Sequence, residues 1–342
     1  MTASYLDSKR ISGDAADIQV SSGGWKELGR TTLGSAADPI TVSSLTDKRY
    51  YMILHDTSGT TTANFYMRYN NDSGSNYSAR ISDNDGAEIL VTSQNKAHLT
   101  GSSDAFKNFG VTYVANMTAK EKLAITHGVD PETAGAATVP TRFERVHKWS
   151  NTAAAINSVD VTTTSPTQII GSEVVVLGWD ESDTHSTNFW EELASVDIST
   201  GTTSTTGTFT AKKYLWVQVY MNSSSIAYDY TFNSDTGSNY AYRKSTNGGS
   251  DGTTASDSVF LSNHGFDSNP HYDNFFIVNN SANEKLVIGN RMSQGTAGAG
   301  SAPNRQEIVG KWANTSSQIT SIQMDNAGTN FTRCIMKVWG SD

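Results

Sequence analysis

The sequence lacks the features that stabilise or anchor many exported proteins. Cys334 is its only cysteine, so no disulfide can form within the chain and no cysteine-based metal site can be built. No stretch approaches the roughly 20 apolar residues of a membrane span, and the opening MTASYLDSKRISGDAADIQ has no apolar core of signal-peptide length. We therefore expect a chain without a signal peptide, made in the cytoplasm, with no membrane as its partner.

Charged residues are also few, at 17% of the chain, and no basic block is found among them. The formal net charge is −9. A surface of that sign repels nucleic-acid phosphates and anionic lipid, so neither nucleic acid nor membrane is an expected partner. Hydrophobic residues make up 36% and aromatic residues 10%, which is too many for a disordered chain.

Motifs for catalysis and for cofactors are missing. The seven histidines are dispersed without zinc spacing, and there is no phosphate-binding loop, nucleophile elbow or dinucleotide fingerprint. Glu121 with Glu144, and Glu284 with Glu307, are the best candidates for the paired carboxylates of a glycosidase. Each lies beside Lys or Arg, which would neutralise it. We expect no enzyme and no cofactor.

What the sequence does contain is a likeness to itself at a spacing of about 163 residues. Trp25–Leu28 corresponds to Trp190–Leu193, and Tyr69–Tyr77 corresponds to Phe232–Tyr240. The longest match, from Thr133, returns at Thr296. A duplicated domain explains matches in one order at a nearly constant offset. The predicted units are an N-terminal docking arm (1–22), a first β-sandwich (23–180), a linker (181–187) and a second β-sandwich (188–342).

Within each repeat the apolar residues alternate with a period of two, which predicts strands. Clusters of Gly, Asn, Asp and Ser punctuate them, as turns require. About eight strands in each repeat indicate an all-β chain of two tandem, jelly-roll-like antiparallel β-sandwich domains related by internal duplication. No amphipathic helix of three turns is expected, and Phe189 to Ala194 has room for one turn at most. The predicted strands include 49–55, 64–69, 111–115, 121–126, 156–161, 173–177, 213–219, 275–278, 284–288, 319–324 and 335–339.

One loop with dense oxygen ligands recurs in both repeats, around Asp72 and Asp235. Calcium binds such loops, so these two aspartates are weak calcium candidates. The alternative is a hairpin turn in which Asn, Asp and Gly accept positive φ or cap the backbone. One carboxylate per loop favours the turn, so we expect no metal site.

A charged strip also recurs. Arg142, Glu144, Val146 and Lys148 share one face of a strand, and four residues from Arg305 to Lys311 repeat the pattern. Cross-strand ion pairs on a solvated or subunit-facing side explain the strip better than a ligand site does. Trp149 and Trp312 point the other way, into each sandwich.

Two groups of residues are candidates for interaction surfaces. Tyr77, Tyr240 and Tyr242 lie next to turns, where they could stack on sugar rings or fill a contact between subunits. In the arm, an ordering segment that docks on a neighbouring chain is favoured over a free tail because it carries apolar anchors. Those anchors are Tyr5, Leu6 and Ile11.

Several strings resemble poorly characterised proteins encoded by marine tailed phages and related environmental viruses. They are SYLDSKRISG, WKELGRTTLGSA, FNSDTGSNY, NEKLVIG and TAGAGSAPNRQEIVGKWANTS. The likeness spans nearly the whole chain. It implies a virion structural component of the capsid surface or the tail, and it supplies no catalytic residues. Repeat one departs from the pattern at Phe143, Arg145 and His147.

The leading hypothesis is therefore a non-catalytic virion structural protein, either a capsid-associated decoration protein or a tail component, made in the host cytoplasm and located in the virion. Its expected partners are further copies of itself, as a homo-oligomer, and other virion structural proteins. The alternative is a carbohydrate-binding adhesin or receptor-binding module, with a host-surface glycan as its partner. A polysaccharide-degrading enzyme and a cellular surface-layer or filament protein rank lower.

Overall fold

The computed structural model describes residues 4–6, 9–11, 24–102, 106–165, 167–183, 187–223, 228–261, 270–326 and 328–342. These residues form 25 β-strands and no helix, so the predicted all-β fold is confirmed. The strand pairs are antiparallel, as short turns between successive strands require. β1 (Ser4–Leu6) and β2 (Lys9–Ile11) form a two-stranded sheet of their own.

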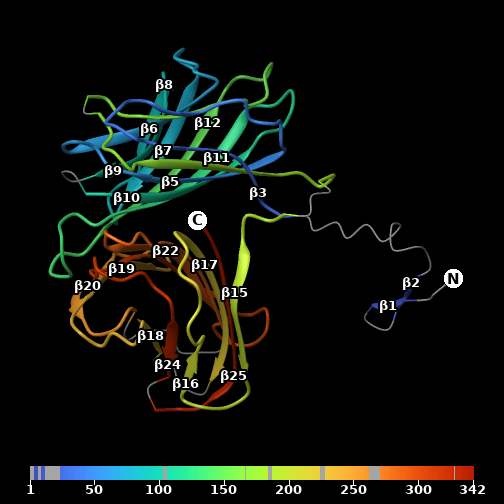
Figure 1. Ribbon diagram of the computed structural model, residues 1–342, viewed down its shortest axis with the longest axis vertical. Coiled ribbons are helices and arrows are strands. Elements are labelled where there is room, and N and C mark those ends of the chain that lie inside the picture. Colours follow the sequence, from blue (N-terminus) through green and yellow to red (C-terminus); the bar gives the residue numbers. More distant parts are fainter. Residues whose placement is uncertain are drawn as a thin grey trace.

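The first sandwich consists of a large and a small sheet built from β3 to β14 (Figure 1). The eight strands of the large sheet run in the order β3 (Lys26–Thr32), β14 (Glu173–Trp179), β5 (Tyr50–Thr57), β10 (Asn108–Ala115), β11 (Lys122–Asp130), β12 (Thr141–Trp149), β7 (Tyr77–Asp83) and β8 (Ile89–Gln94). The four strands of the small sheet run in the order β4 (Ile40–Val42), β13 (Val159–Thr162), β6 (Ala63–Tyr69) and β9 (Ala97–Ser102).

The second sandwich follows the same plan from β15 to β25. Its large sheet has the order β15 (Glu191–Ile198), β25 (Phe331–Ser341), β17 (Tyr214–Ser223), β21 (His271–Val278), β22 (Lys285–Ser293), β23 (Asn304–Trp312), β19 (Tyr240–Thr246) and β20 (Gly252–Asp257). Its small sheet contains β16 (Thr203–Thr205), β24 (Ile322–Asp325) and β18 (Asp229–Phe232). Strand by strand, the two large sheets have matching orders. The duplication itself concerns the history of the chain and stays a prediction.

Each sandwich encloses an apolar core between its two sheets. Phe65, Met67 and Tyr69 alternate along β6 and are all buried, as their spacing predicts. Trp149 and Trp312 are buried in the first and the second core respectively, so their predicted inward direction is confirmed.

A third apolar cluster lies between the sandwiches, where the outer faces of the two large sheets pack on each other (Figure 1). The first sandwich contributes residues of β5, β10, β11 and β14, and the second contributes residues of β17, β21, β22 and β23. Phe109 and Val129 of the first sheet and Ile288 of the second are each at most 3% exposed. The two halves therefore share a third core in addition to the core that each sandwich encloses by itself.

Three details differ from the sequence prediction. The described residues of the two sandwiches form twelve and eleven strands rather than about eight, because short edge strands such as β8 and β20 extend each large sheet. The segment from Phe189 is not a helical turn and leads into β15, where its apolar residues pack on the third cluster. The first part of the linker folds back on the first sandwich, where Arg49 binds Glu181 at 2.7 Å.

Candidate functional site

The loops around Asp72 and Asp235 are hairpin turns. Asp72 Oδ2 accepts hydrogen bonds from Trp149 Nε1 at 2.6 Å and from Asn76 Nδ2 at 2.9 Å, and Oδ1 accepts one from the Gly74 N–H at 2.8 Å. The second repeat has the same arrangement, with Trp312 Nε1 donating to Asp235 Oδ2 at 2.7 Å.

Within the described part of the chain, the partners of these carboxylates are N–H donors, so the oxygens that a cation would need already accept hydrogen bonds. Burial alone would raise the pKa of Asp72, but the bonds from Trp149, Asn76 and Gly74 lower it overall, and the same holds for Asp235. Positive φ at Asn70, Asn71 and the equivalent positions completes the turn. The loops around Asp72 and Asp235 therefore form the turn that the sequence favours, and calcium binding there stays a question for experiment.

The surface role predicted for three tyrosines is wrong. Tyr77, Tyr240 and Tyr242 are 1%, 0% and 1% exposed. Tyr77 Oη accepts a hydrogen bond from the Tyr69 N–H at 3.0 Å, and Tyr240 accepts one from the backbone of Phe232 at 2.9 Å. Their rings pack in the cores, so they stabilise the hairpins from inside.

The predicted anchors of the docking arm lie in the two-stranded sheet of β1 and β2, in which Tyr5 pairs with Arg10 and Leu6 with Lys9. The side chains of Tyr5, Leu6 and Ile11 lie outside the described part of the chain, as do residues 1–3, 7–8 and 12–22 of the arm. Docking of the arm stays a prediction. Phe143, Arg145 and His147, at which repeat one departs from the pattern, are buried.

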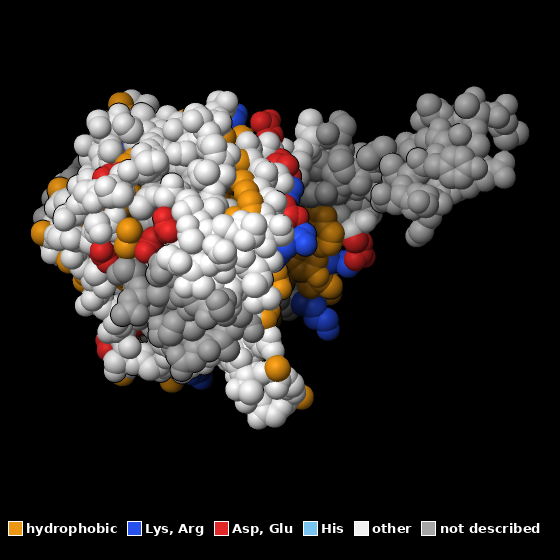
Figure 2. All heavy atoms as spheres, turned by 90° about the horizontal axis from the view of Figure 1, so that it is seen from below, with side chains coloured by type: hydrophobic (Ala, Val, Ile, Leu, Met, Phe, Trp, Pro, Cys, Tyr) orange, Lys and Arg blue, Asp and Glu red, His pale blue; other side chains and the backbone are white. Residues whose placement is uncertain are grey.

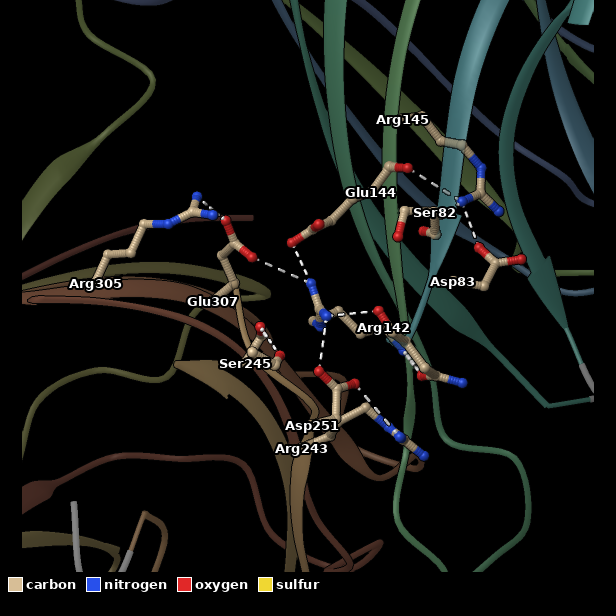
Figure 3. A network of polar contacts seen from close by, with 12 residues as sticks. Ser82, Asp83, Arg142, Glu144, Arg145, Arg243, Ser245, Asp251, Arg305 and Glu307 are labelled. Atoms are coloured by element: carbon tan, nitrogen blue, oxygen red, sulfur yellow. Dashed lines mark hydrogen bonds and ion pairs between the residues drawn. The ribbon is translucent and has the colours of Figure 1, made fainter. Parts of the chain in front are cut away.

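Arg142 lies at the centre of a polar network where the two sandwiches meet (Figure 3). Its guanidinium donates to Glu144 on the same strand and reaches Glu307 Oε2 at 3.4 Å and Asp251 Oδ1 at 2.8 Å, both in the second sandwich. It also donates to the Asn84 carbonyl oxygen at 2.6 Å. Only 4% of Arg142 is exposed. The predicted ion-pair strip is thus, at this end, a clamp between the two halves.

The glutamates do not form the pairs that the sequence suggested, which joined Glu121 to Glu144 and Glu284 to Glu307. Glu121 and Glu284 each form an ion pair with a lysine on a neighbouring strand. Glu144 instead lies beside Glu307 of the second sandwich, and burial together with the Glu144 carboxylate raises the pKa of Glu307. A carboxyl of raised pKa beside a second carboxylate is the composition of an acid–base pair. Because both side chains are bound by one arginine, we assign them to the clamp.

A second residue of the recurring strip also joins the two halves. Lys311 is fully buried, and its ammonium group donates to the carbonyl oxygens of Pro131 at 2.8 Å and Thr133 at 2.6 Å, both in the first sandwich. Lys148 occupies the equivalent place in the first sandwich, where 45% of its side chain is exposed. The two repeats therefore use the same position differently.

An apolar groove of about 900 Å³ lies on the outer face of the first large sheet. It occupies the end of that face that the second sandwich leaves uncovered. Its base contains Leu123, Ile125 and Val146, which are 57%, 51% and 44% exposed. The residues that line it are Trp25, Tyr50, Tyr51, Ser78, Ala79, Arg80, Leu90, Val91, Thr92, Tyr113, Val114, Ala115, Leu123, Ala124, Ile125, Val146, His147, Lys148 and Trp179.

Figure 2 looks at the molecule from below and shows a patch of hydrophobic side chains beside the nearer part of the molecule, bordered by charged side chains. Aromatic rings form one wall of the groove, where Tyr50 stacks on Trp179 at 5.5 Å between ring centroids. Few polar side chains line it. Such a surface suits the burial of apolar side chains of another protein better than reaction chemistry.

Sequence reasoning missed this groove, although a signal was present. In β10 and β11 both faces carry apolar residues, for example Val114 and Tyr113, or Ala124 and Ile125. A strand in a two-layer sandwich with one solvated face shows polar residues on that face. Apolar residues on both faces indicate a further layer.

The described part of the chain contains no cluster of three or more His, Cys, Asp or Glu side chains placed to hold a metal ion. It also contains no helix with the length and hydropathy needed to span a bilayer.

Comparisons with known proteins assign no family. No protein-family model matches the chain, and no curated protein matches it. Among solved structures, the crystal structure of a Pseudomonas aeruginosa FadL homologue is similar with a TM-score of 0.09 and 8% sequence identity, over 87% of this chain and 92% of that chain. A likeness of that size carries no argument about fold or function.

Proposed function

We propose that this chain is a non-catalytic structural protein of a virion that acts by self-assembly and by presenting its surface. The observation that carries the proposal is the open groove with Leu123, Ile125 and Val146 at its base. Soluble proteins that act alone rarely expose a contiguous apolar surface of this kind, and such surfaces mark interaction sites.

The contact between the sandwiches supports a structural role, because it makes one unit of two domains. Beside the third apolar cluster and the Arg142 clamp, Lys213 of the second sandwich binds Glu173 of the first at 2.9 Å, and Tyr214 Oη donates to the same carboxylate at 2.8 Å. Two sandwiches held in this way present their loops at a fixed spacing, which suits a component of a regular shell or tube.

The resemblance to virion proteins of marine tailed phages supports the virion as the place of action, at the capsid surface or in the tail. Its partners would be further copies of the chain and other virion proteins. The purified full chain tests the self-assembly part. Sedimentation velocity should show a defined oligomer whose share of the protein rises with concentration. A chain that stays monomeric at every concentration would refute self-assembly. In purified particles of a virus that encodes the chain, mass spectrometry should find it in fixed stoichiometry.

A glycan-binding adhesin is the second candidate, and the stacked pair Tyr50 and Trp179 favours it because exposed aromatic rings bind sugar faces. Glycan-array binding that is lost in Trp179→Ala would support this function. Tyr240→Ala is unsuitable for the test, since Tyr240 is buried and its loss would damage the core.

A further inference from the structure

Equivalent residues of the two large sheets have opposite exposure. Leu123, Ile125 and Val146 of the first sheet are 57%, 51% and 44% exposed. Their equivalents 163 residues later, Leu286, Ile288 and Val309, are 1%, 3% and 2% exposed, because the first sandwich covers them. We call the part of each large sheet that carries these three residues its receiving end. It is covered on the second sandwich and open, as the groove, on the first.

At the opposite end of each large sheet, the residues of the first sandwich are buried and their equivalents in the second sandwich are exposed. Phe109 and Val129 pair across β10 and β11 and are 1% and 0% exposed in the contact between the sandwiches. Their equivalents Tyr272 and Met292 pair across β21 and β22 and are 38% and 46% exposed. We call this position the inserting end. It is used by the first sandwich and is open on the second.

Equivalent residues meet in part of the contact, where Tyr113 lies 6.4 Å from Phe276 between ring centroids and Glu144 lies beside Glu307. Elsewhere the contact within the chain joins two different surfaces, the inserting end of the first sandwich and the receiving end of the second. A contact between unlike surfaces leaves one of each kind unused, here the groove on the first sandwich and the row at Tyr272 and Met292 on the second. Contacts of this type build rings or open filaments when they repeat.

The two ends that are open to solvent carry charges of opposite sign, as do the two ends that meet within the chain. Within the chain, Arg142 of the inserting end binds Asp251 beside the receiving end at 2.8 Å. The equivalent of Arg142 is Arg305, and the equivalent of Asp251 is Glu88. The side chains of Arg305 and Glu88 are 62% and 50% exposed. Between two copies they would form the pair that Arg142 and Asp251 form within one.

We propose that the groove of the first sandwich receives the inserting end of the second sandwich of another copy, so that the contact between chains repeats the contact within the chain. The apolar part of the new contact places Tyr272 and Met292 on Ile125 and Val146, and its ionic part joins Arg305 to Glu88. This inference rests on the proposed function, since it names the surfaces through which self-assembly takes place.

Single-surface variants of the full chain test the proposal by sedimentation velocity. Ile125→Lys in the groove and Met292→Lys at the inserting end should each weaken self-association by roughly tenfold or more, since either places an unpaired charge in an apolar contact. Ile170→Lys is the matched control, because Ile170 is 64% exposed and lines neither surface, and it should leave association unchanged. Circular dichroism should confirm that all three variants fold.

Mixing distinguishes unlike surfaces from a contact between two identical ones. Ile125→Lys keeps an intact inserting end and Met292→Lys keeps an intact groove, so their equimolar mixture should form a two-chain complex and nothing longer. Exchanging the charges of Glu88 and Arg305 tests how the two copies are aligned in the contact, and it changes no apolar residue. Glu88→Arg and Arg305→Glu should each weaken association, and the double variant should recover it.

Failure of the inference is distinct from failure of the proposed function. If the wild-type chain assembles while Ile125→Lys and Met292→Lys leave assembly unchanged, the function stands and the named surfaces are wrong. If removal of residues 1–23 abolishes assembly and Met292→Lys does not, the arm drives assembly and the inference is overturned. If the wild-type chain never associates, the proposed self-assembly fails together with the inference.

Discussion

Arg291 and Asp273 form a two-bond ion pair inside the second sandwich, with Nε 2.9 Å from Oδ1 and Nη2 2.8 Å from Oδ2. Both residues are 1% exposed. Tyr230 Oη donates to the same carboxylate at 2.5 Å, and burial holds the pKa of that phenol well above its ordinary value, so the phenol keeps its proton. The carboxylate is satisfied on both oxygens.

Removal of this carboxylate should be costly because it leaves a buried guanidinium without a counter-charge. We expect Asp273→Asn to lower the free energy of unfolding by about 3–5 kcal/mol, measured by urea denaturation at neutral pH. Asp197→Asn is the control, since Asp197 and Arg333 form a pair whose side chains are both 51% exposed. Its loss should cost less than about 1 kcal/mol, and equal losses in the two variants would contradict the assignment.

The hairpin carboxylates make a second prediction. Asp235→Ala leaves Trp312 Nε1 and the Gly237 N–H without their acceptor, which should destabilise the second sandwich by about 1–3 kcal/mol. Ser238→Ala in the same exposed loop should have little effect. Added calcium should leave the thermal midpoint of the wild-type chain unchanged. A midpoint that rises with calcium would restore the cation interpretation.

Acid should weaken the first sandwich through His55. Burial lowers the pKa of His55 from 6.5 to about 4, and the nearby Asp56 only partly opposes this. Below pH 6.5 the unfolded chain therefore binds the proton that the folded chain excludes. The stability contribution is complete above pH 6.5, falls as the pH drops toward 4, and can reach about 3 kcal/mol.

The variant His55→Val tests this dependence, because Val219 occupies the equivalent place in the second sandwich. We expect its thermal midpoint to fall less than that of the wild-type chain between pH 7 and pH 4.5 in scanning calorimetry. His147, whose pKa burial likewise lowers to about 4, supplies the acid sensitivity that remains. An identical fall in variant and wild type would refute the role of His55.

The clamp at Arg142 predicts how the two halves unfold together. Arg142→Gln removes the cation of the first sandwich that Asp251 and Glu307 of the second sandwich share, which should cost about 3 kcal/mol. Calorimetry should then resolve two transitions where the wild-type chain shows one. Arg305→Gln is the matched control, since Arg305 binds the same Glu307 from an exposed position. Two transitions in this control as well would show that the clamp does not couple the halves.

The repeat and the alternating pattern predicted the strands well, because both are local or order-based signals. The segment 64–69 became β6 and 121–126 became part of β11, and the register of the pattern correctly directed Trp149 inward. The prediction that the three tyrosines lie on the surface was wrong for a physical reason. A period of two identifies the two faces of a strand but not which face is buried, and a position next to a turn does not make a side chain exposed, as Tyr77 and Tyr240 show.

The candidate site was less accessible to sequence reasoning. The partners of Arg142 in the second sandwich lie more than 100 residues away, and no spacing rule links them. Identical residue types at Leu123 and Leu286 also conceal opposite environments, because exposure depends on how the sandwiches stack and not on the strand that carries the residue.

Because the linker predicted at 181–187 is short, the contact between the two sandwiches of one chain should not be lost on dilution. A tether of this length keeps the second sandwich near the first at an effective concentration of the order of millimolar, so this contact forms as soon as the chain is made, even in a single molecule. Any joining of separate chains has no such tether. It therefore depends on the concentration of the chain, whereas the contact within the chain does not.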